Sequence, residues 1–169
     1  GLRALQGRGE LEALLTRVLK ARKSLVPILL KIAPDLTEAD RADIAAVALD
    51  LKLDGLIVSN TTIERDGLVA GAHVGETGGL SGRPLMPMST RVLADIYRLT
   101  GGRIPIVGVG GIANADDAWA RIRAGASLVQ LYSAMVYEGP GIARAICNGL
   151  VDLMRRDGFT TLSEAVGTE

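Results

Sequence analysis

The hydrophobic positions of this chain switch between helical spacing and short continuous runs. Leu11, Leu15 and Val18 recur at intervals of three or four residues, which predicts an amphipathic helix over residues 9–23. The next segment, residues 26–33, is apolar except for one lysine, as is typical of a strand buried on both faces of a parallel sheet. The chain therefore begins with a helix followed by a strand.

The same alternation continues to the end of the chain. Thr37, with Asp40 three residues later, has the pattern of a helix N-cap and predicts a helix to about residue 52. Further strands are predicted at residues 55–59, 104–109 and 128–132, and further helices from an N-cap at Ser89 to about residue 99, at 114–124 and at about 142–157, with a short helical turn beyond them. The glycine-rich stretch 60–88 has no clear period, and a loop of that length is usually functional.

Repeated strand–helix units predict an α/β fold with a parallel sheet, because each crossover helix returns the chain to the same end of the sheet. An open doubly wound sheet would place a glycine-rich turn after its first strand. Here the glycine turns follow the third strand and border the long loop, which matches the phosphate site of (β/α)8 TIM barrels. Since such a barrel takes roughly 250 residues, we predict that the 169 residues form its C-terminal half.

Composition and charge restrict the function. The chain is 48% hydrophobic, and 19 basic residues balance 19 acidic ones, so it lacks the positive charge expected of a nucleic-acid-binding protein. The single cysteine cannot form an internal disulfide, which favours a reducing compartment, and no apolar run is long enough to span a membrane. A first residue that is glycine rather than methionine indicates a processed or truncated piece of a longer protein.

Polar side chains at strand ends are the first candidates for chemistry. Lys31 lies near the end of an apolar strand, so its ammonium group either extends to water along its stem or points into a polar pocket, where it would stabilise negative charge. Asn60, Thr61 and Thr62 directly follow the second strand and would present amide and hydroxyl groups at the same rim. Such residues are also common turn formers, and both readings stay open.

Two neighbouring strand ends predict an anion site. Residues 108–111 (GVGG) and 131–133 (LYS) follow neighbouring strands, where backbone amides backed by a helix N-terminus could bind phosphate without a basic side chain. The paired glycines in residues 78–84 would let a backbone approach a ligand closely. The order GVGGIAN is not the dinucleotide fingerprint GxGxxG, so a mononucleotide-type phosphate is the better prediction.

The other reactive or aromatic side chains are predicted to be structural or solvated. His73 has no second histidine or cysteine nearby, so no metal site is predicted, and Cys147 is expected on the apolar side of the last helix rather than as a nucleophile. Trp119 and Tyr97 are expected to pack helices, and the pair at 155–156 is expected to form a solvated helix end.

Several longer segments together carry a family resemblance. These are KIAPDLT, SNTT, GGLSGRPL, GVGGI, RAGASLVQLYSA and a closing GF. In this order, over essentially all 169 residues, the chain closely resembles the C-terminal half of dihydroorotate dehydrogenases of the membrane-associated, quinone-using class.

The resemblance implies an FMN-dependent oxidoreductase of pyrimidine biosynthesis that oxidises (S)-dihydroorotate to orotate and passes electrons to a quinone. It implies peripheral association with a membrane, the bacterial cytoplasmic membrane rather than the mitochondrial inner membrane. The base, a serine in this class, would precede Gly1, and residues 1–9 would end a mobile active-site loop. The N-terminal half-barrel and the quinone-access helices would lie outside this chain, which alone is expected to be inactive.

The resemblance also assigns roles to individual residues. Lys31 would lie beside the N1–O2 edge of the flavin and stabilise negative charge there, and Ser59 would also contact the flavin. Asn60 and Thr61 would bind dihydroorotate. The ribityl phosphate would be held by Gly82, Gly110 and Gly111, together with the backbone of Tyr132 and Ser133.

Two other functions compete with this one. A flavin-dependent α-hydroxy-acid oxidase would share the phosphate site but should supply a histidine base, and the only histidine is His73 in a poor context. A non-enzymatic half-barrel that assembles with another chain would bind no flavin. The visible absorbance of bound flavin distinguishes the last case from the other two.

Overall fold

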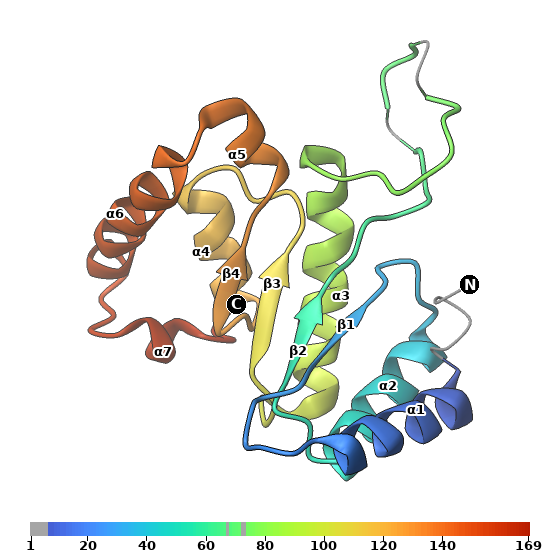
Figure 1. Cartoon of the computed structure of the whole chain (residues 1–169). Coiled ribbons are helices and arrows are strands. Elements are labelled where there is room, and N and C mark those ends of the chain that lie inside the picture. Colours follow the sequence, from blue (N-terminus) through green and yellow to red (C-terminus); the bar gives the residue numbers. More distant parts are fainter. Residues whose placement is uncertain (1–6, 67, 72–73) are drawn as a thin grey trace.

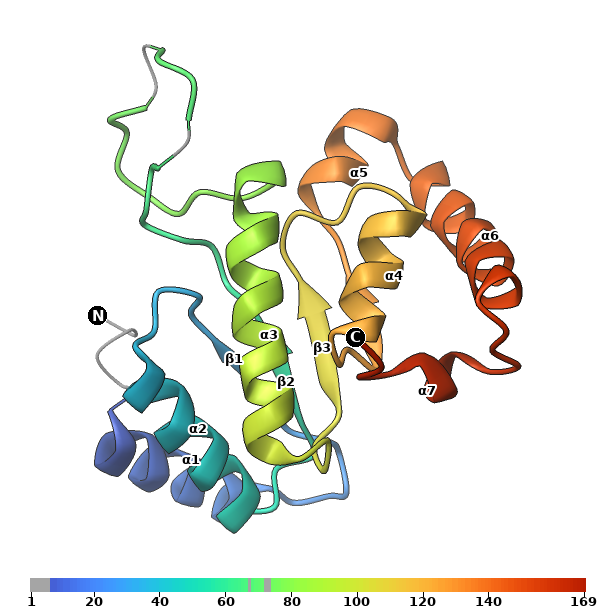
Figure 2. The ribbon, with the colours of Figure 1, turned by 180° about the vertical axis from the view of Figure 1, so that it is seen from behind.

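The fold is a single parallel sheet with its helices on one side (Figures 1 and 2). It is described by a computed structural model that covers residues 7–66, 68–71 and 74–169. The strands are β1 (Leu29–Ile32), β2 (Gly55–Val58), β3 (Ile106–Val109) and β4 (Leu128–Gln130). The helices are α1 (Arg8–Ala21), α2 (Glu38–Asp50), the 3-10 turn η2 (Arg83–Leu85), α3 (Met86–Thr100), α4 (Ala115–Arg123), α5 (Ser133–Glu138), α6 (Gly141–Arg156) and α7 (Leu162–Ala165).

The strands lie in the order in which they occur in the sequence. The sheet order is β1-β2-β3-β4 and every neighbouring pair is parallel, which confirms the prediction from the repeated strand–helix units. Each strand is shorter than its predicted segment, since the ladder begins only at Leu29 in β1 and ends at Gln130 in β4. All four strands end at the same edge of the sheet, so the segments that follow them are brought together there.

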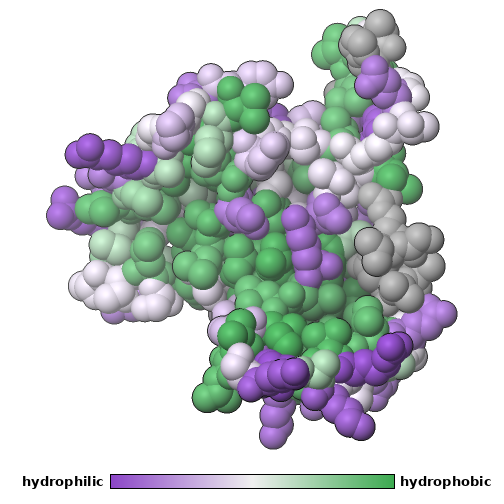
Figure 3. Space-filling model, in the orientation of Figure 1, coloured by the Kyte–Doolittle hydropathy of each residue, from purple (hydrophilic) through white to green (hydrophobic). Residues whose placement is uncertain are grey.

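The prediction that residues 26–33 are buried on both faces is wrong. The register places Lys31 beside Ile57 and Ile32 beside Val58, so alternate residues face opposite sides of the sheet. Ile32 and Val58 are fully buried under the helices, whereas Lys31 is exposed. Among the described residues no element covers the second face, and Figure 3 shows apolar side chains gathered across it.

Two helix starts were predicted from capping residues, with opposite outcomes. Thr37 caps α2 in a capping box, in which its hydroxyl accepts from the Asp40 amide and the Asp40 carboxylate accepts from the Thr37 amide, as predicted. Ser89 is not a cap, because α3 begins three residues earlier at Met86, led in by η2 and by a proline in its first turn. The Ser89 hydroxyl instead donates to the carbonyl oxygens of Met86 and Gly110 inside the protein.

The helices bury two apolar clusters against the sheet. One lies beneath β1 to β3 with α1, α2 and α3, and half-buried Tyr97 packs against it. The other joins α4, α6 and α7 around Trp119, whose ring meets Phe159 edge-on with centroids 5.8 Å apart. These contacts confirm Tyr97 and Trp119 as packing residues.

Cys147 does not belong to the apolar side of α6, which corrects its predicted placement. Ile142, Ile146 and Leu150 follow a four-residue spacing and form the buried stripe, while Cys147, one position after Ile146, is exposed. Arg155 and Arg156 are exposed at the end of α6, as predicted. No helix of the described residues combines the length and the apolar character needed to cross a membrane.

The carboxylate of Asp157 joins α4 to the end of α6. It should make the free energy of unfolding depend on pH in the acidic range. Arg156 donates to it at 2.7 Å and the Trp119 indole at 2.8 Å, and these bonds lower the pKa of Asp157 to about 2. As the pH falls, Asp157 is protonated in the unfolded chain before it is protonated in the folded chain. The carboxylate therefore stabilises the fold above its ordinary pKa of 3.8, and this stabilisation is lost as the pH falls towards about 2. We expect Asp157→Asn to weaken the loss of stability over this range, measured by urea unfolding at several pH values.

Asp152→Asn is the matched control, since Asp152 is an exposed acid on the same helix. It should leave the acid dependence of the wild type unchanged. An Asp157→Asn protein whose unfolding free energy varies with pH as steeply as that of the wild type would contradict the role of this carboxylate.

Candidate active site

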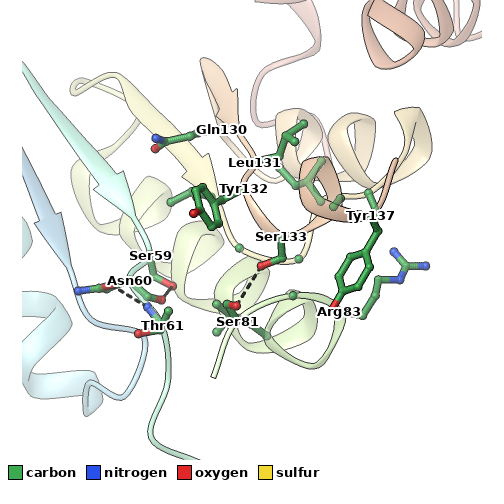
Figure 4. Close-up of a pocket in the computed structure, with 18 of the residues that line it drawn as sticks. Ser59, Asn60, Thr61, Ser81, Arg83, Gln130, Leu131, Tyr132, Ser133 and Tyr137 are labelled. Atoms are coloured by element: carbon green, nitrogen blue, oxygen red, sulfur yellow. Dashed lines mark hydrogen bonds between the residues drawn. The ribbon is translucent and has the colours of Figure 1, made fainter. Parts of the chain in front are cut away.

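A cavity of about 560 Å³ lies at the carboxyl ends of the strands (Figure 4). This volume is within the range of about 300–1,000 Å³ that small-molecule sites occupy. Every residue to which the family resemblance assigns a role lines it, namely Lys31, Ser59, Asn60, Thr61, Gly82, Gly110, Gly111, Tyr132 and Ser133. The fold thus brings together residues that are up to about a hundred positions apart in the sequence, as expected when parallel strands end at one edge.

Lys31 reaches the cavity from the uncovered face of the sheet. Its register partner in β2 is Ile57, and both alternate with residues that point into the helical layer. Its side chain is exposed and lines the cavity. It makes no ion pair with any residue that the structure describes, so its charge is available to a ligand.

The end of β2 is held in place by both neighbouring strands. The amide of Ser59 donates to the carbonyl oxygen of Val109 at 3.0 Å, and the amide of Asn60 donates to that of Ile32 at 2.8 Å. The Asn60 side-chain oxygen accepts from the Thr61 amide at 2.9 Å, which fixes the orientation of the carboxamide (Figure 4). Ser59 is buried, so this segment presents polar groups from a rigid base.

Thr62, expected at the same rim, is instead buried. Its hydroxyl donates to a carboxylate oxygen of Asp35, which also accepts from the amide of Ile63. Its backbone pairs with Leu80 across the long loop in an antiparallel bridge. Asp35 and Thr62 therefore tie the start of the loop to the end of β1, a role that sequence reasoning missed because the two residues lie 27 positions apart.

The turn after β3 needs glycine for two reasons. Gly110 and Gly111 have φ angles of 114° and 83°, a region that residues with a side chain rarely adopt. A Cβ atom at Gly111 would also lie 2.6 Å from Met86 Cβ, and one at Gly110 would lie 2.9 Å from Leu85 Cδ2. The amides of Gly110 and Gly111 donate no hydrogen bond to the described residues, so they are free to bind a ligand.

The glycine-rich loop approaches the end of β4 at the same place. The hydroxyl of Ser133 donates to that of Ser81 at 2.9 Å (Figure 4), and a Cβ atom at Gly82 would lie 3.7 Å from Ser133 Cβ. Tyr132 lies just before α5 and is largely exposed, at 80%. The glycine-rich segment 78–84 and the segment after β4 therefore lie in contact at the cavity.

Other residues line the cavity without having been assigned a role of their own, among them Ser81, Arg83 and Tyr137. Arg83 forms an ion pair with Asp117 of α4, whose carboxylate also accepts from the Ala113 amide. Arg83 lies within residues 78–84, the glycine-containing segment that was predicted to approach a ligand. Tyr137 gave no signal, because α5 has only six residues and buries none of them.

His73 lies outside the described residues. Among the described residues there is no group of three or more histidine, cysteine, aspartate or glutamate side chains that could hold a metal ion.

The comparison with protein families decides the relationship. The family model for dihydroorotate dehydrogenase matches residues 1–154. The chain belongs to the dihydroorotate dehydrogenase family. Curated relatives named dihydroorotate dehydrogenase (quinone) include one from Parvibaculum lavamentivorans, 63% identical over 169 residues, and one from Novosphingobium aromaticivorans, 55% identical over 170 residues. The resemblance to the quinone-using class is thereby confirmed.

The chain spans about half the length of the curated relatives it matches. The match covers 100% of the chain but only 49% of the Parvibaculum relative and 48% of the Novosphingobium relative. Among solved structures, the ligand-free dihydroorotate dehydrogenase of Eimeria tenella superposes with a TM-score of 0.94 at 40% identity, over 99% of this chain and 52% of that one. The predicted fold class, half of a (β/α)8 barrel, is therefore confirmed.

Proposed function

We propose that this chain forms the cofactor-phosphate half of an FMN-dependent, quinone-reducing dihydroorotate dehydrogenase. The reaction is the oxidation of (S)-dihydroorotate to orotate, the redox step of pyrimidine biosynthesis. The observation that carries the proposal is the cavity at the strand ends, where a lysine, an asparagine and a glycine turn with unpaired amides face the same space. The family membership and the quinone-class relatives support the same reaction.

The residues of the cavity fit FMN. The free amides of Gly110 and Gly111, with the hydrogen-bonded hydroxyl pair of Ser81 and Ser133 nearby, form a donor set suited to a phosphate group. The cavity is large enough for a mononucleotide, and Gly82 and Ser133 both line it. When bound, FMN would accept two electrons from the substrate and pass them to the quinone.

The remaining residues act by charge and by orientation. The Lys31 ammonium would stabilise negative charge at the edge of the bound cofactor, because a fixed cation there needs no reorganisation. Ser59 would contact the same cofactor. The Asn60 carboxamide and the Thr61 hydroxyl would bind the dihydroorotate ring, and the rigid strand end would keep both in register.

The uncovered face of the sheet supports the proposed domain arrangement. Leu29 is 39% exposed and Leu128 66% exposed on that face, and a second half-barrel would bury both. In this arrangement residues 1–169 are the C-terminal half of one FMN-binding barrel. The active-site loop would end within residues 1–9, of which Arg8 and Gly9 already belong to α1. The serine base, the N-terminal half-barrel and the quinone-access helices come from outside these 169 residues.

The quinone and the membrane are further proposed partners. Val136 and Tyr137 of α5 are 69% and 85% exposed, and Tyr137 also lines the cavity. Exposed apolar groups beside a redox site suit a quinone and the segment that admits it. We propose peripheral attachment to a bacterial cytoplasmic membrane through that segment.

The proposed arrangement predicts that residues 1–169 alone do not turn over dihydroorotate, because they lack the base and half of the barrel. Production of orotate by the purified 169-residue chain with a soluble quinone analogue is the measurement. Turnover by this chain would show that it contains all the residues that the reaction needs.

The function is tested by the visible spectrum and intact mass of the protein as its organism produces it. We expect bound flavin that bleaches when dihydroorotate is added without oxygen, and a mass about twice that of this chain. Flavin that bleaches with a 2-hydroxy acid but not with dihydroorotate would indicate an α-hydroxy-acid oxidase instead. Absence of flavin would indicate a half-barrel without this activity.

A further inference from the structure

Arg121 is the largest side chain that the structure buries completely. It projects from α4 beneath the end of β3 and has 0% exposure. Gly108 makes room for it, because a Cβ atom there would lie 2.4 Å from Arg121 Cγ. A strand glycine and a helix arginine thus fit together directly under the turn that lines the cavity.

The guanidinium group binds the backbone of that turn. Nη1 donates to the carbonyl oxygen of Val109 at 3.2 Å, and Nη2 donates to that of Gly110 at 2.8 Å. Nη2 also lies 2.8 Å from the Ser89 hydroxyl and 3.0 Å from the Met86 sulfur. Arg121 therefore joins the turn after β3 to the start of α3.

These bonds determine where the amides of the turn point. In a trans peptide the carbonyl and the following N–H lie in one plane and point in opposite directions. The Gly110 carbonyl is directed at Arg121, so the amide of Gly111 points away from the guanidinium group, while the Val109 carbonyl is shared between Arg121 and the Ser59 amide of β2. The amides of Gly110 and Gly111 belong to residues that line the cavity. The same two amides have no acceptor among the described residues.

Arg121 is also an uncommonly isolated charge. All its hydrogen-bond partners are neutral, and its Nε atom has none in the part of the chain that the structure describes. Burial lowers the pKa of Arg121 to about 10, with Asp117 opposing the shift, so it stays protonated at neutral pH. The Asp117 carboxylate itself binds Arg83 and the Ala113 amide.

A buried cation without a bonded carboxylate is costly unless something negative lies nearby. An anion held by the amides of Gly110 and Gly111 would sit just across the turn, where water screens the attraction poorly. A simple packing role would be served by an apolar side chain at lower cost.

We propose that Arg121 is a positioning residue for the phosphate of the flavin cofactor. It holds the two glycine amides towards the phosphate and supplies a positive charge beneath them, so it selects FMN over the unphosphorylated riboflavin. This inference rests on the proposed function and adds a determinant of cofactor specificity that does not line the cavity.

The test compares FMN and riboflavin binding to the flavin-free form of the complete protein, followed by quenching of flavin fluorescence. Arg121→Gln should weaken FMN binding by about tenfold or more while leaving riboflavin binding unchanged. Arg121→Lys keeps the charge but cannot hold both carbonyls. Its preference for FMN over riboflavin should lie between those of the wild type and Arg121→Gln. Arg123→Gln, a charge loss on the same helix at a residue that bonds Thr168, should match the wild type.

Equal weakening of both flavins in Arg121→Gln would overturn the proposal, because it would show a purely structural role. If that variant does not fold, Arg121→Lys decides, and an undiminished preference for FMN would overturn the proposal. A wild-type protein that binds neither flavin would refute the proposed function itself, which is a distinct result.

Discussion

Replacing Lys31 with methionine is expected to slow the bleaching of bound flavin by dihydroorotate about 10²- to 10³-fold. The ammonium group lies in the cavity and makes no ion pair with the described residues, so its charge is available to negative charge that develops on the cofactor. Methionine keeps an unbranched side chain but removes the charge. Stopped-flow absorbance without oxygen measures this step apart from quinone reduction.

The fold should tolerate this substitution, because Lys31 is exposed on the uncovered face and its backbone stays in the ladder between β1 and β2. Lys20→Met, which removes an exposed lysine from α1, is the matched control and should bleach at the wild-type rate. Flavin content and melting temperature should be unchanged in both variants. Wild-type bleaching in a folded, flavin-loaded Lys31→Met protein would rule out the charge-stabilising role.

The sequence predicts the order of elements well because that order depends on local spacing. Thr37 and Asp40 lie in one helical turn, so their capping box is visible from two letters three positions apart. Ser89 carries the same kind of signal but is misleading, because the preceding turn of η2 leads directly into α3. A capping residue marks a helix start only when the chain before it is not already helical.

Burial was harder to predict than secondary structure, because it depends on what packs against each face. The strand containing Lys31 looks buried on both sides by composition, yet the described helices cover only one face of the sheet. Cys147 has apolar neighbours in the sequence, but it is rotated by one residue from the buried stripe of α6. One position on a helix turns a side chain by about 100°, enough to leave the core.

The cavity residues were predictable where a strand ends in a glycine or a polar group, since parallel strands bring those ends together. The residues that hold the cavity-lining segments in place were not predictable from the sequence. Arg121 reads as an ordinary solvated arginine in a helix, and only its packing against Gly108 and its bonds to two carbonyls reveal another role. The ion pair of Arg83 with Asp117 joins residues 34 positions apart, beyond any local pattern.

Gly111→Ala is expected to be among the most damaging single substitutions in the chain. The added Cβ atom would lie 2.6 Å from Met86 Cβ and 2.8 Å from Met86 N, so the turn and the start of α3 cannot both keep their places. The φ angle of 83° adds backbone strain. We expect the free energy of unfolding to fall by about 2–5 kcal/mol and FMN binding to be lost, measured by urea unfolding and flavin content.

Gly139→Ala separates the effect of the collision with Met86 from the effect of backbone strain. Gly139 has a similar φ angle of 75°, but a Cβ atom there would meet nothing within 4 Å, so this variant carries the backbone strain without the collision. It should lose about 1–3 kcal/mol and keep its flavin. If both alanine variants lost the same stability and kept FMN, the close approach of Gly111 to Met86 would not be what shapes the phosphate site. If only Gly111→Ala loses FMN, the glycine is required because the turn must pass directly against α3 to aim its amides at the cofactor.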